Sequence, residues 1–214
     1  MTQSVTVNSQ WLAQSREQLV EFHPLVAGDG ITRGLIGPRE IPRLWPRHLD
    51  NCAAVADPDV DLVPQAATVV DIGSGAGLPG VVWALVRPDL RVTLIEPLSR
   101  RTAFLQETVN HLGIADRVIV LRGRGQDVDP CSASIVTSRA VASMSALLEV
   151  SQRHLAPGGR VLAIKGGRAM AELAECRDTI RDSHGSAEVV TIGPPGADGH
   201  PLATVIKIDY EEMS

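Results

Sequence analysis

Aromatic residues are scarce in this sequence and make up 3% of its 214 residues. Leucine, valine, isoleucine and alanine must therefore fill the core, and a hydrophobic content of 44% is sufficient for one. RNA-binding sheets that stack bases on aromatic side chains need such residues at strand centres. The scarcity excludes that class of RNA-binding module.

Cysteine is equally rare. Cys52, Cys131 and Cys176 are far apart and form no CxxC motif or Cys/His cluster. This argues against a disulfide framework and against a zinc site, so no metal is expected, and it is typical of a reducing cytosol. The first 18 residues lack a basic start and an apolar core, and no apolar run approaches the roughly 18 residues of a membrane span. We expect a cytoplasmic protein without a membrane partner.

Lysine occurs only at positions 165 and 207, so 18 of the 20 basic residues are arginines. The net charge of −5 by itself argues against a nucleic-acid partner. The planar guanidinium of arginine nevertheless suits phosphates and bases better than the ammonium of lysine. The position of the arginines in the fold therefore decides more than the net charge.

The chain divides into a helical extension, residues 1–60, and a Rossmann-like domain, residues 61–214. In the extension, apolar spacing predicts a helix over 9–22 and glycines predict loops at 28–30 and 34–38. A second helix is expected to begin near Leu44 to Pro46. Its predicted buried residues are Leu49, Cys52 and Val55.

In the domain, short apolar runs alternate with helical stretches. The runs typical of buried parallel strands are residues 68–72, 92–96, 118–121, 133–137 and 160–164. The helical stretches are residues 80–86, 98–112, 144–155 and 170–180. Two further strands, at 188–192 and 202–209, flank a glycine- and proline-rich loop typical of an antiparallel hairpin. Five βα units and a hairpin predict an α/β fold with a seven-stranded, mixed, doubly wound sheet.

A glycine-rich loop from Asp71 to Gly80 follows the first of these strands. Such a loop lets the backbone approach a ligand and opens a helix whose N-terminus carries partial positive charge. From Gly75 the loop matches G-x-G-x-x-G, and Glu96 ends the next strand, where its carboxylate can accept hydrogen bonds from ribose hydroxyls. This combination predicts a nucleoside cofactor.

Three features favour S-adenosylmethionine over a nicotinamide as that cofactor. Asp71 stands two residues before Gly73, where a carboxylate can meet the methionine ammonium, and the terminal hairpin is the ending typical of methyltransferases. Nothing after Glu96 resembles a hydride-transfer site. Two structural alternatives stay open: Asp71 as a cap or brace of the loop, and Glu96 as an ordinary acid at a strand end.

Four motifs in the correct order resemble the RsmG (GidB) family, the bacterial 16S ribosomal RNA guanine-N7 methyltransferases. They are Arg47-His48-Leu49-Asp50-Asn51, Asp71 to Gly80, Ser138-Arg139-Ala140 and Lys165-Gly166. The resemblance covers residues 40–170 and implies a class I S-adenosylmethionine-dependent methyltransferase fold. It also implies methylation of N7 of a guanosine in 16S rRNA, as naked RNA or in the 30S subunit, by a monomer.

The resemblance extends to the site. The family's adenine-side turn corresponds to Arg124 to Asp127, and its strand-four arginine corresponds to Arg139. Loop and resemblance together predict these cofactor-binding residues: Asp71, Gly73, Gly75, Gly77, Leu78, Glu96, Gly125, Gln126 and Arg139. The chain departs from the family at Asn51, often a serine, at Gln126-Asp127, usually a glutamate pair, and at residues 34–39, which replace an Asn-Leu-Thr segment.

The acceptor chemistry agrees with what the sequence lacks. Guanine N7 has a free lone pair, so no base need deprotonate it, and Arg139 is expected to act as the catalytic residue by positioning the reactants. The place after the fourth strand reads Thr137-Ser138-Arg139 and not the Asn/Asp-Pro-Pro-aromatic run of exocyclic-amine methyltransferases. Neither Cys52 nor Cys131 stands where a nucleophile for ring-carbon methylation would.

Arg139 is expected at the carboxyl edge of the sheet, where open α/β sheets bind ligands. The predicted RNA-binding residues are Arg47, His48, Arg124 and Lys165, with Arg124 and Lys165 ending neighbouring strands and Arg33, Arg39 and Arg43 extending the patch. Structural alternatives to these roles stay open. The surface arginines can be solvated charges, and Arg139 can be buried and paired with an acid such as Asp71. His48 can help Asp50 brace the first helix, and Trp45 can pack in the core instead of stacking on a base.

Rival functions also stay open. A small-molecule or protein methyltransferase on the same fold would need no arginine patch. A nicotinamide-dependent oxidoreductase belongs to another class, and Asp71 and the closing hairpin count against it. A nucleic-acid-binding scaffold with a vestigial loop is disfavoured because the glycines and both acids are present.

Overall fold

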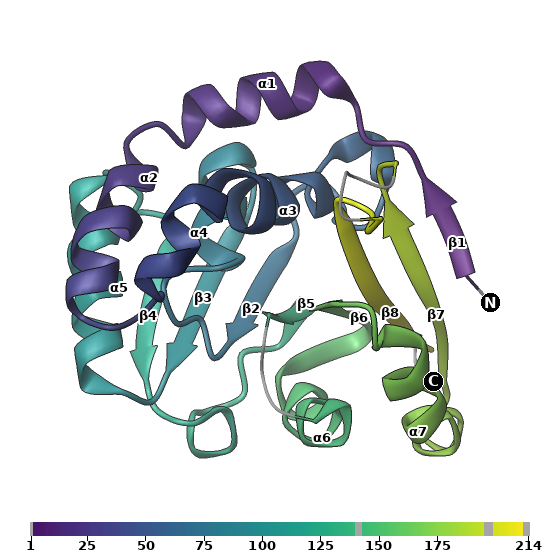
Figure 1. Cartoon of the computed structure of the whole chain (residues 1–214). Helices are drawn as coiled ribbons and strands as arrows, with labels where there is room; N and C mark the ends of the chain where they lie inside the picture. The colour runs from purple at the N-terminus through teal and green to yellow at the C-terminus, as the bar shows by residue number, and fades with distance from the viewer. Residues whose placement is uncertain (1, 140–142, 195–198, 212–214) are drawn as a thin grey trace.

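Eight strands form one sheet in the order β1-β7-β8-β6-β5-β2-β3-β4 (Figure 1). The computed structural model describes residues 2–139, 143–194 and 199–211. The strands are β1 Thr2–Val5, β2 Thr68–Ile72, β3 Arg91–Glu96, β4 Val118–Arg122, β5 Ala133–Arg139, β6 Leu155–Lys165, β7 Gly185–Ile192 and β8 Ala203–Tyr210. β8 runs antiparallel to β6 and β7, and every other pair is parallel. The mixed sheet and its terminal hairpin confirm the predicted fold class.

The strand β1 was not predicted, so the sheet has eight strands and not seven. Thr2 to Val5 pair in parallel with Val189 to Ile192 of β7. The first three residues of β1 are exposed and the fourth is half-buried. A strand without a buried face leaves no apolar pattern in the sequence, because its pairing to an existing edge defines it.

Helices cover both faces of the sheet (Figure 1). The α-helices are α1 Ser9–Gln18, α2 Phe22–Leu25, α3 Asp50–Val55, α4 Gly80–Val86, α5 Ser99–His111, α6 Met144–His154 and α7 Ala169–Asp182. Residues of the first five pack with one face of the sheet in one apolar cluster, and residues of α6 and α7 pack with the other face in a second cluster. The extension therefore shares a core with α4, α5 and one face of the sheet.

The extension differs in detail from the prediction. The first helix ends at Gln18, and a separate turn, α2, follows. Pro24 explains the interruption, because its ring clashes with the carbonyl four residues earlier and it has no N–H to donate. The segment 28–30 is no loop but lies in a π-helical turn, Val26–Gly30. The second helix begins as another π-helical turn, Leu44–Leu49, and continues as α3.

The described residues between β4 and β5 form a single 3-10 turn, Gly125–Asp127, and no α-helix. The expectation of five βα units was therefore wrong at this unit. The connection of residues 123–132 is short and contains Gly123, Gly125 and Pro130, which disfavour a helix. Part of the sheet face over β3 and β4 remains uncovered, and Ile119 of β4 is 58% exposed.

Two predicted features fall partly outside the described residues. They are Ala140 of the Ser138-Arg139-Ala140 motif and residues 195–198 of the hairpin loop. Among the helices that the structure describes, none is both long and apolar enough to cross a membrane.

Candidate active site

The loop from Asp71 to Gly80 leaves β2 at the carboxyl edge of the sheet and leads into α4. The backbone amides of Gly73 and Ser74 donate to the Ile95 carbonyl at 2.8 and 3.2 Å, which ties the loop to the end of β3. The Ser74 carbonyl accepts from the amides of Gly77 and Leu78 at 2.7 and 3.1 Å. These bonds tie the loop to β3 and close it on its own backbone.

Glycine is required at several loop positions. Gly73, Gly75 and Gly77 have φ values of 71°, 56° and 88°, in the left-handed region. A Cβ on Gly77 would also lie 2.6 Å from Cγ2 of Val81, and one on Gly80 would overlap Leu94 and lie 2.8 Å from Oδ2 of Asp71. The loop backbone therefore packs closely against β3 and α4, and its glycines leave room that side chains would otherwise fill.

Asp71 is completely buried beneath this loop. Its Oδ2 accepts a hydrogen bond from the Gly80 amide at 3.0 Å, so the carboxyl group braces the start of α4. Its Oδ1 is buried and has no hydrogen-bond partner in the structure. Burial raises the pKa of Asp71 to about 7, against the opposing effect of the hydrogen bond from Gly80. Asp71 thus braces the loop, as one of the two alternatives for this residue held. Its Oδ1 remains available for a further donor.

Glu96 ends β3 and is 1% exposed. Its Oε2 accepts from the Gly75 amide at 3.0 Å and its Oε1 accepts from the Leu98 amide at 3.0 Å. Arg101 lies 3.8 Å from Oε2. A carboxylate has about four lone-pair sites, and the two backbone donors leave capacity for hydroxyl donors.

Leu98 was not among the predicted site residues. It is 50% exposed beside Glu96, although it is a large apolar side chain. The signal in the sequence was an apolar residue two positions after the strand-end acid, ahead of the helix α5.

The turn Gly125–Asp127 follows β4 at the same edge. Gly125 is buried, and a Cβ there would overlap Val150 of α6, while Gln126 and Asp127 are exposed. The Gly125 carbonyl accepts a hydrogen bond from Nε2 of His154 at 2.8 Å. The predicted residues Gly125 and Gln126 thus stand on a turn that the buried His154 contacts, a residue that no sequence pattern indicates.

Arg139 is the last residue of β5 and is half-buried. Its Nη2 donates to the Arg47 carbonyl at 2.8 Å, and its Nη1 lies 4.0 Å from Sγ of Cys52. The preceding Ser138 donates its Oγ hydrogen to the Ile72 carbonyl at 2.9 Å, which sets the end of β5 beside the glycine loop. Arg139 therefore links the loop edge to the extension, and neither of these two contacts is with Asp71.

His48 and Trp45 of the extension make structural contacts. Nε2 of His48 lies 2.9 Å from Oε2 of Glu40, and burial lowers the pKa of the imidazole. Asp50 braces α1 without His48, through a two-pronged ion pair with Arg16, so the predicted partnership of His48 with Asp50 was wrong. Trp45 stacks on His23 with ring centroids 5.0 Å apart.

Arg124 and Lys165 do not end neighbouring strands. They follow β4 and end β6, and the strand order places β5, β2 and β3 between these two strands. The expected cluster of both residues was therefore wrong, because crossover connections separate strands that are close in sequence. Nζ of Lys165 also pairs with Oε2 of Glu172 at 2.8 Å, and the Lys165 side chain is 8% exposed. Arg47 and Arg124 are exposed.

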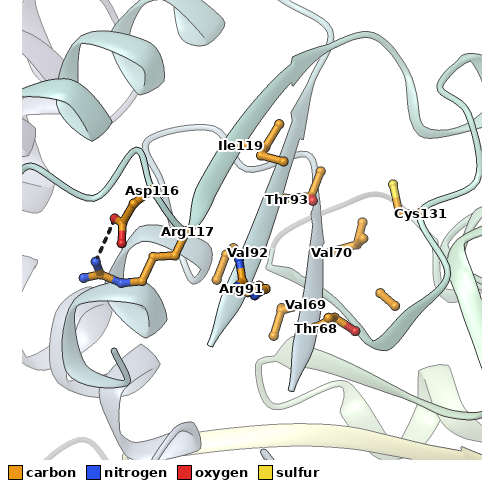
Figure 2. A pocket seen from close by; sticks show the side chains of 11 residues that line it. Thr68, Val69, Val70, Arg91, Val92, Thr93, Asp116, Arg117, Ile119 and Cys131 are labelled. Atoms are coloured by element: carbon orange, nitrogen blue, oxygen red, sulfur yellow. Dashed lines mark hydrogen bonds and ion pairs between the residues drawn. The ribbon is translucent and has the colours of Figure 1, made fainter. Parts of the chain in front are cut away.

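A pocket of about 140 Å³ lies at the opposite edge, by the amino ends of β2 and β3 (Figure 2). Thr68 and Arg91, which begin these strands, line it together with Cys131, the Asp116–Arg117 ion pair and neighbouring residues of β2, β3, β4 and β5. None of the predicted site residues lines it. Among the described residues, no three His, Cys, Asp or Glu side chains cluster as a metal site would require.

The carboxyl edge fits a cofactor with a nucleoside and an ammonium group. The glycine loop exposes backbone without side chains, Glu96 keeps acceptor capacity, and Oδ1 of Asp71 is a buried acceptor without a donor. The edge therefore offers acceptors of the kinds that ribose hydroxyls and an amino-acid ammonium need.

Comparisons with solved structures show the fold. P. horikoshii TYW2 in complex with MeSAdo matches with a TM-score of 0.61 at 15% identity, over 78% of this chain and 64% of that chain. M. jannaschii TYW2 in complex with AdoMet matches with a TM-score of 0.53 at 18% identity, over 69% of each chain. The chain thus has the class I S-adenosylmethionine-dependent methyltransferase fold.

Comparisons with sequences show the family. The model of the GidB family, described as rRNA small subunit methyltransferase G, matches residues 15–193. The ribosomal RNA small subunit methyltransferase G of Thermobifida fusca is 50% identical over 189 residues, which are 87% of this chain and 77% of that protein. The enzyme of the same name from Kineococcus radiotolerans is 44% identical over 195 residues, 90% of this chain and 74% of that protein. This chain belongs to the rRNA small subunit methyltransferase G family, the S-adenosylmethionine-dependent enzymes that methylate small-subunit rRNA.

Proposed function

We propose that this chain methylates N7 of a guanosine in an unpaired loop of 16S rRNA, with Arg139 positioning the acceptor. The observation that carries the proposal is the place of Arg139, which ends β5 beside the glycine loop and bonds the Arg47 carbonyl at 2.8 Å. A guanidinium there can donate to guanine O6, next to the N7 lone pair. It also joins the cofactor edge to the segment of the extension that carries Arg43 and Arg47.

The cofactor supplies an electrophilic methyl group on its sulfonium. In our proposal Glu96 accepts hydrogen bonds from the ribose hydroxyls, and Leu98 and the turn at Gly125 and Gln126 flank the adenine. Leu98 supports this arrangement because a large apolar side chain, 50% exposed next to Glu96, gains from contact with an apolar ring face. Asp71 keeps its brace on Gly80 and offers Oδ1 toward the ammonium.

No side chain in this arrangement needs to remove a proton. Guanine N7 already carries a lone pair, so the chain's task is to hold acceptor and donor in line. His48, beside Arg47, is a candidate for a general base, but its Nε2 already forms a hydrogen bond with Oε2 of Glu40. The buried Cys52 has its pKa raised to about 11 by desolvation and is no nucleophile at neutral pH.

The RNA surface that we propose consists of Arg39, Arg43 and Arg47, together with Arg139 and Arg124. Arg39, Arg43 and Arg47 are exposed, and among the described residues no ion pair is recorded for their side chains. Lys165 is a weaker candidate, since a phosphate would have to displace Glu172 from it. Arginines in one segment next to the site suit an RNA backbone.

The decisive experiment uses 30S subunits and 16S rRNA from a strain that lacks this modification. The chain is incubated with S-adenosylmethionine at low salt, and the RNA is digested and analysed by mass spectrometry. The proposal predicts one equivalent of 7-methylguanosine with at least one of the two substrates. Methylation of another atom, or of no nucleoside, would contradict it.

Arg139→Ala tests the positioning role. We expect kcat to fall by about 100-fold, because a misplaced acceptor loses the in-line geometry. Arg177→Ala on α7, an exposed arginine far along the chain, is the matched control and should retain turnover. Unchanged turnover and unchanged cofactor affinity in Arg139→Ala would show that Arg139 is only a structural link to the Arg47 carbonyl.

A further inference from the structure

The turn Gly125–Asp127 depends on α6 for its position. The connection between β4 and β5 contains no α-helix among its residues, all of which the structure describes, so the turn has no helix of its own to hold it. Its local backbone bond is that from the Asp127 amide to the Arg124 carbonyl, at 2.9 Å. Side chains from the C-terminal half of α6 contact the turn.

We propose that His154, at the end of α6, is a positioning residue for the nucleoside half of the cofactor site. This inference rests on the proposed function, which places the adenine at Gly125 and Gln126. His154 does not touch the ligand in this proposal. It acts through the Gly125 carbonyl, to which its Nε2 bonds at 2.8 Å.

The chemistry of the pair fixes the state of the ring. A carbonyl only accepts hydrogen bonds, so Nε2 of His154 carries the hydrogen and donates. His154 is completely buried, and its Nδ1 has no hydrogen-bond partner. The side chain is therefore a directed donor to a single carbonyl.

The same helix contacts the turn at two further points. Val150 fills the space that a side chain at Gly125 would need. Nε of Arg153 donates to the carbonyl of Val128, the residue that follows the turn, at 3.1 Å. The last turn of α6 thus holds the turn at its first residue and at the residue after its last one. A turn held at both ends presents Gln126 in one place.

The other end of α6 lies close in sequence to Arg139. The helix begins at Met144, and Oγ of Ser143 caps it by accepting from the Ala146 amide at 3.3 Å. One rigid element therefore separates the residue proposed to hold the acceptor from the turn proposed to hold the adenine. His154 lies at the end of α6 that contacts the adenine-side turn. Its loss should therefore weaken cofactor binding and leave the affinity for rRNA unchanged.

The test measures binding of nucleoside ligands to the full-length protein without RNA. Calorimetry gives Kd for S-adenosylhomocysteine and for 5′-methylthioadenosine, which lacks the amino-acid part. We expect His154→Leu to raise both Kd values about tenfold, since the Gly125 carbonyl loses its donor. The KM for 30S subunits and kcat at saturating donor should stay within about twofold. His154→Gln, whose Nε2 can reach the same carbonyl, should restore most of the affinity.

Ser151→Ala is the matched control, because Ser151 is equally buried on α6 and its Oγ has no hydrogen-bond partner in the structure. If His154→Leu does not fold, Arg153→Met carries the test and should weaken both ligands several-fold. A folded His154→Leu with unchanged Kd values would overturn the inference, as would a failure of glutamine to rescue. A wild-type protein that binds neither ligand would instead refute the cofactor-site assignment.

Discussion

Asp71 is a carboxyl group in a place that penalises its charge. It is completely buried, and desolvation raises its pKa to about 7, assisted by the nearby Glu96 and opposed by hydrogen bonds from Gly80 and Ser74. In the unfolded chain the pKa lies near 3.8. The folded protein therefore holds a proton at Asp71 over a pH range in which the unfolded chain has released it.

This difference predicts how stability depends on pH. Because the folded pKa is the higher one, the contribution of Asp71 is fully present below the unfolded pKa and is lost as pH rises toward about 7. Asp71→Asn should abolish this part of the dependence, so that the loss of unfolding free energy between about pH 4 and about pH 7 shrinks by more than about 1 kcal/mol. Urea unfolding of both proteins without cofactor measures it, and parallel pH profiles would contradict it.

Gly80 begins α4, and its amide donates to the Asp71 carboxyl group. A Cβ at this position would overlap Leu94 and lie 2.8 Å from the Asp71 carboxylate. Gly80→Ala should therefore lower the unfolding free energy by about 1–3 kcal/mol, the usual cost of overpacking. Gly28→Ala is the control, since nothing lies within 4 Å of a Cβ there. Equal stability of the two variants in urea unfolding would show that the loop is loosely packed.

The sequence was sufficient to place residues at the site but not to give their partners. Asp71, Glu96 and Arg139 were predictable because each is the last or the next-to-last residue of a recognisable apolar strand. The ion pair of Lys165 with Glu172 and the contact of His48 with Glu40 were not, because they depend on how α7 and the extension pack. His154 was missed for the same reason: its acceptor is a carbonyl 29 positions away.

At the scale of elements, β4 has two unlike faces. Val118 points into the core with α4 and α5 and is 3% exposed, whereas its neighbour Ile119 is 58% exposed on the side without a helix. Val118→Thr should lower the unfolding free energy by about 1–2 kcal/mol through burial of a hydroxyl, and Ile119→Thr should change it by less than about 0.5 kcal/mol. Chemical unfolding measures both. A large loss in Ile119→Thr would indicate that something covers this face.

The elements that were predicted correctly are those with a buried pattern of their own. The helix at 80–86 and the strand at 68–72 were predicted at their observed bounds, since their buried residues other than Asp71 are apolar or glycine and lie in one run. The strand β1 and the break at residues 19–21 were missed, because pairing with β7 and the presence of Pro24 decided them. Apolar periodicity reports burial, and these features do not depend on it.

At the scale of the whole molecule, the distribution of charge matters more than its sum. The net charge is −5, yet the segment Pro38–Arg43 and Arg47 carry exposed arginines beside the carboxyl edge of the sheet. Several acids pair with other basic residues, as Glu172 does with Lys165 and Asp50 with Arg16. A negatively charged protein can thus present a local positive surface to RNA.

This charge distribution predicts a steep salt dependence of rRNA binding. The affinity for 16S rRNA should fall linearly in log–log form with salt, because each arginine–phosphate contact releases counterions. Arg43→Gln should reduce the magnitude of the slope by about 1 and leave the Kd for S-adenosylhomocysteine unchanged. Arg177→Gln on α7 is the control and should keep the wild-type slope. Filter binding at a series of salt concentrations measures the slope for each variant, and equal slopes for Arg43→Gln and the wild type would contradict the prediction.

The uncovered strand β4 also bears on how the protein behaves in a concentrated solution. It is an edge strand, so its outer backbone groups and the exposed Ile119 together form a template onto which another chain can add. Arg122 is exposed at the end of β4, whereas Arg117 before its start is paired with Asp116, so a second chain that adds at this edge meets the charge of Arg122. A charged residue beside an edge strand disfavours self-assembly. Colloidal stability at this edge therefore depends on charge repulsion, where a covering helix would otherwise provide it.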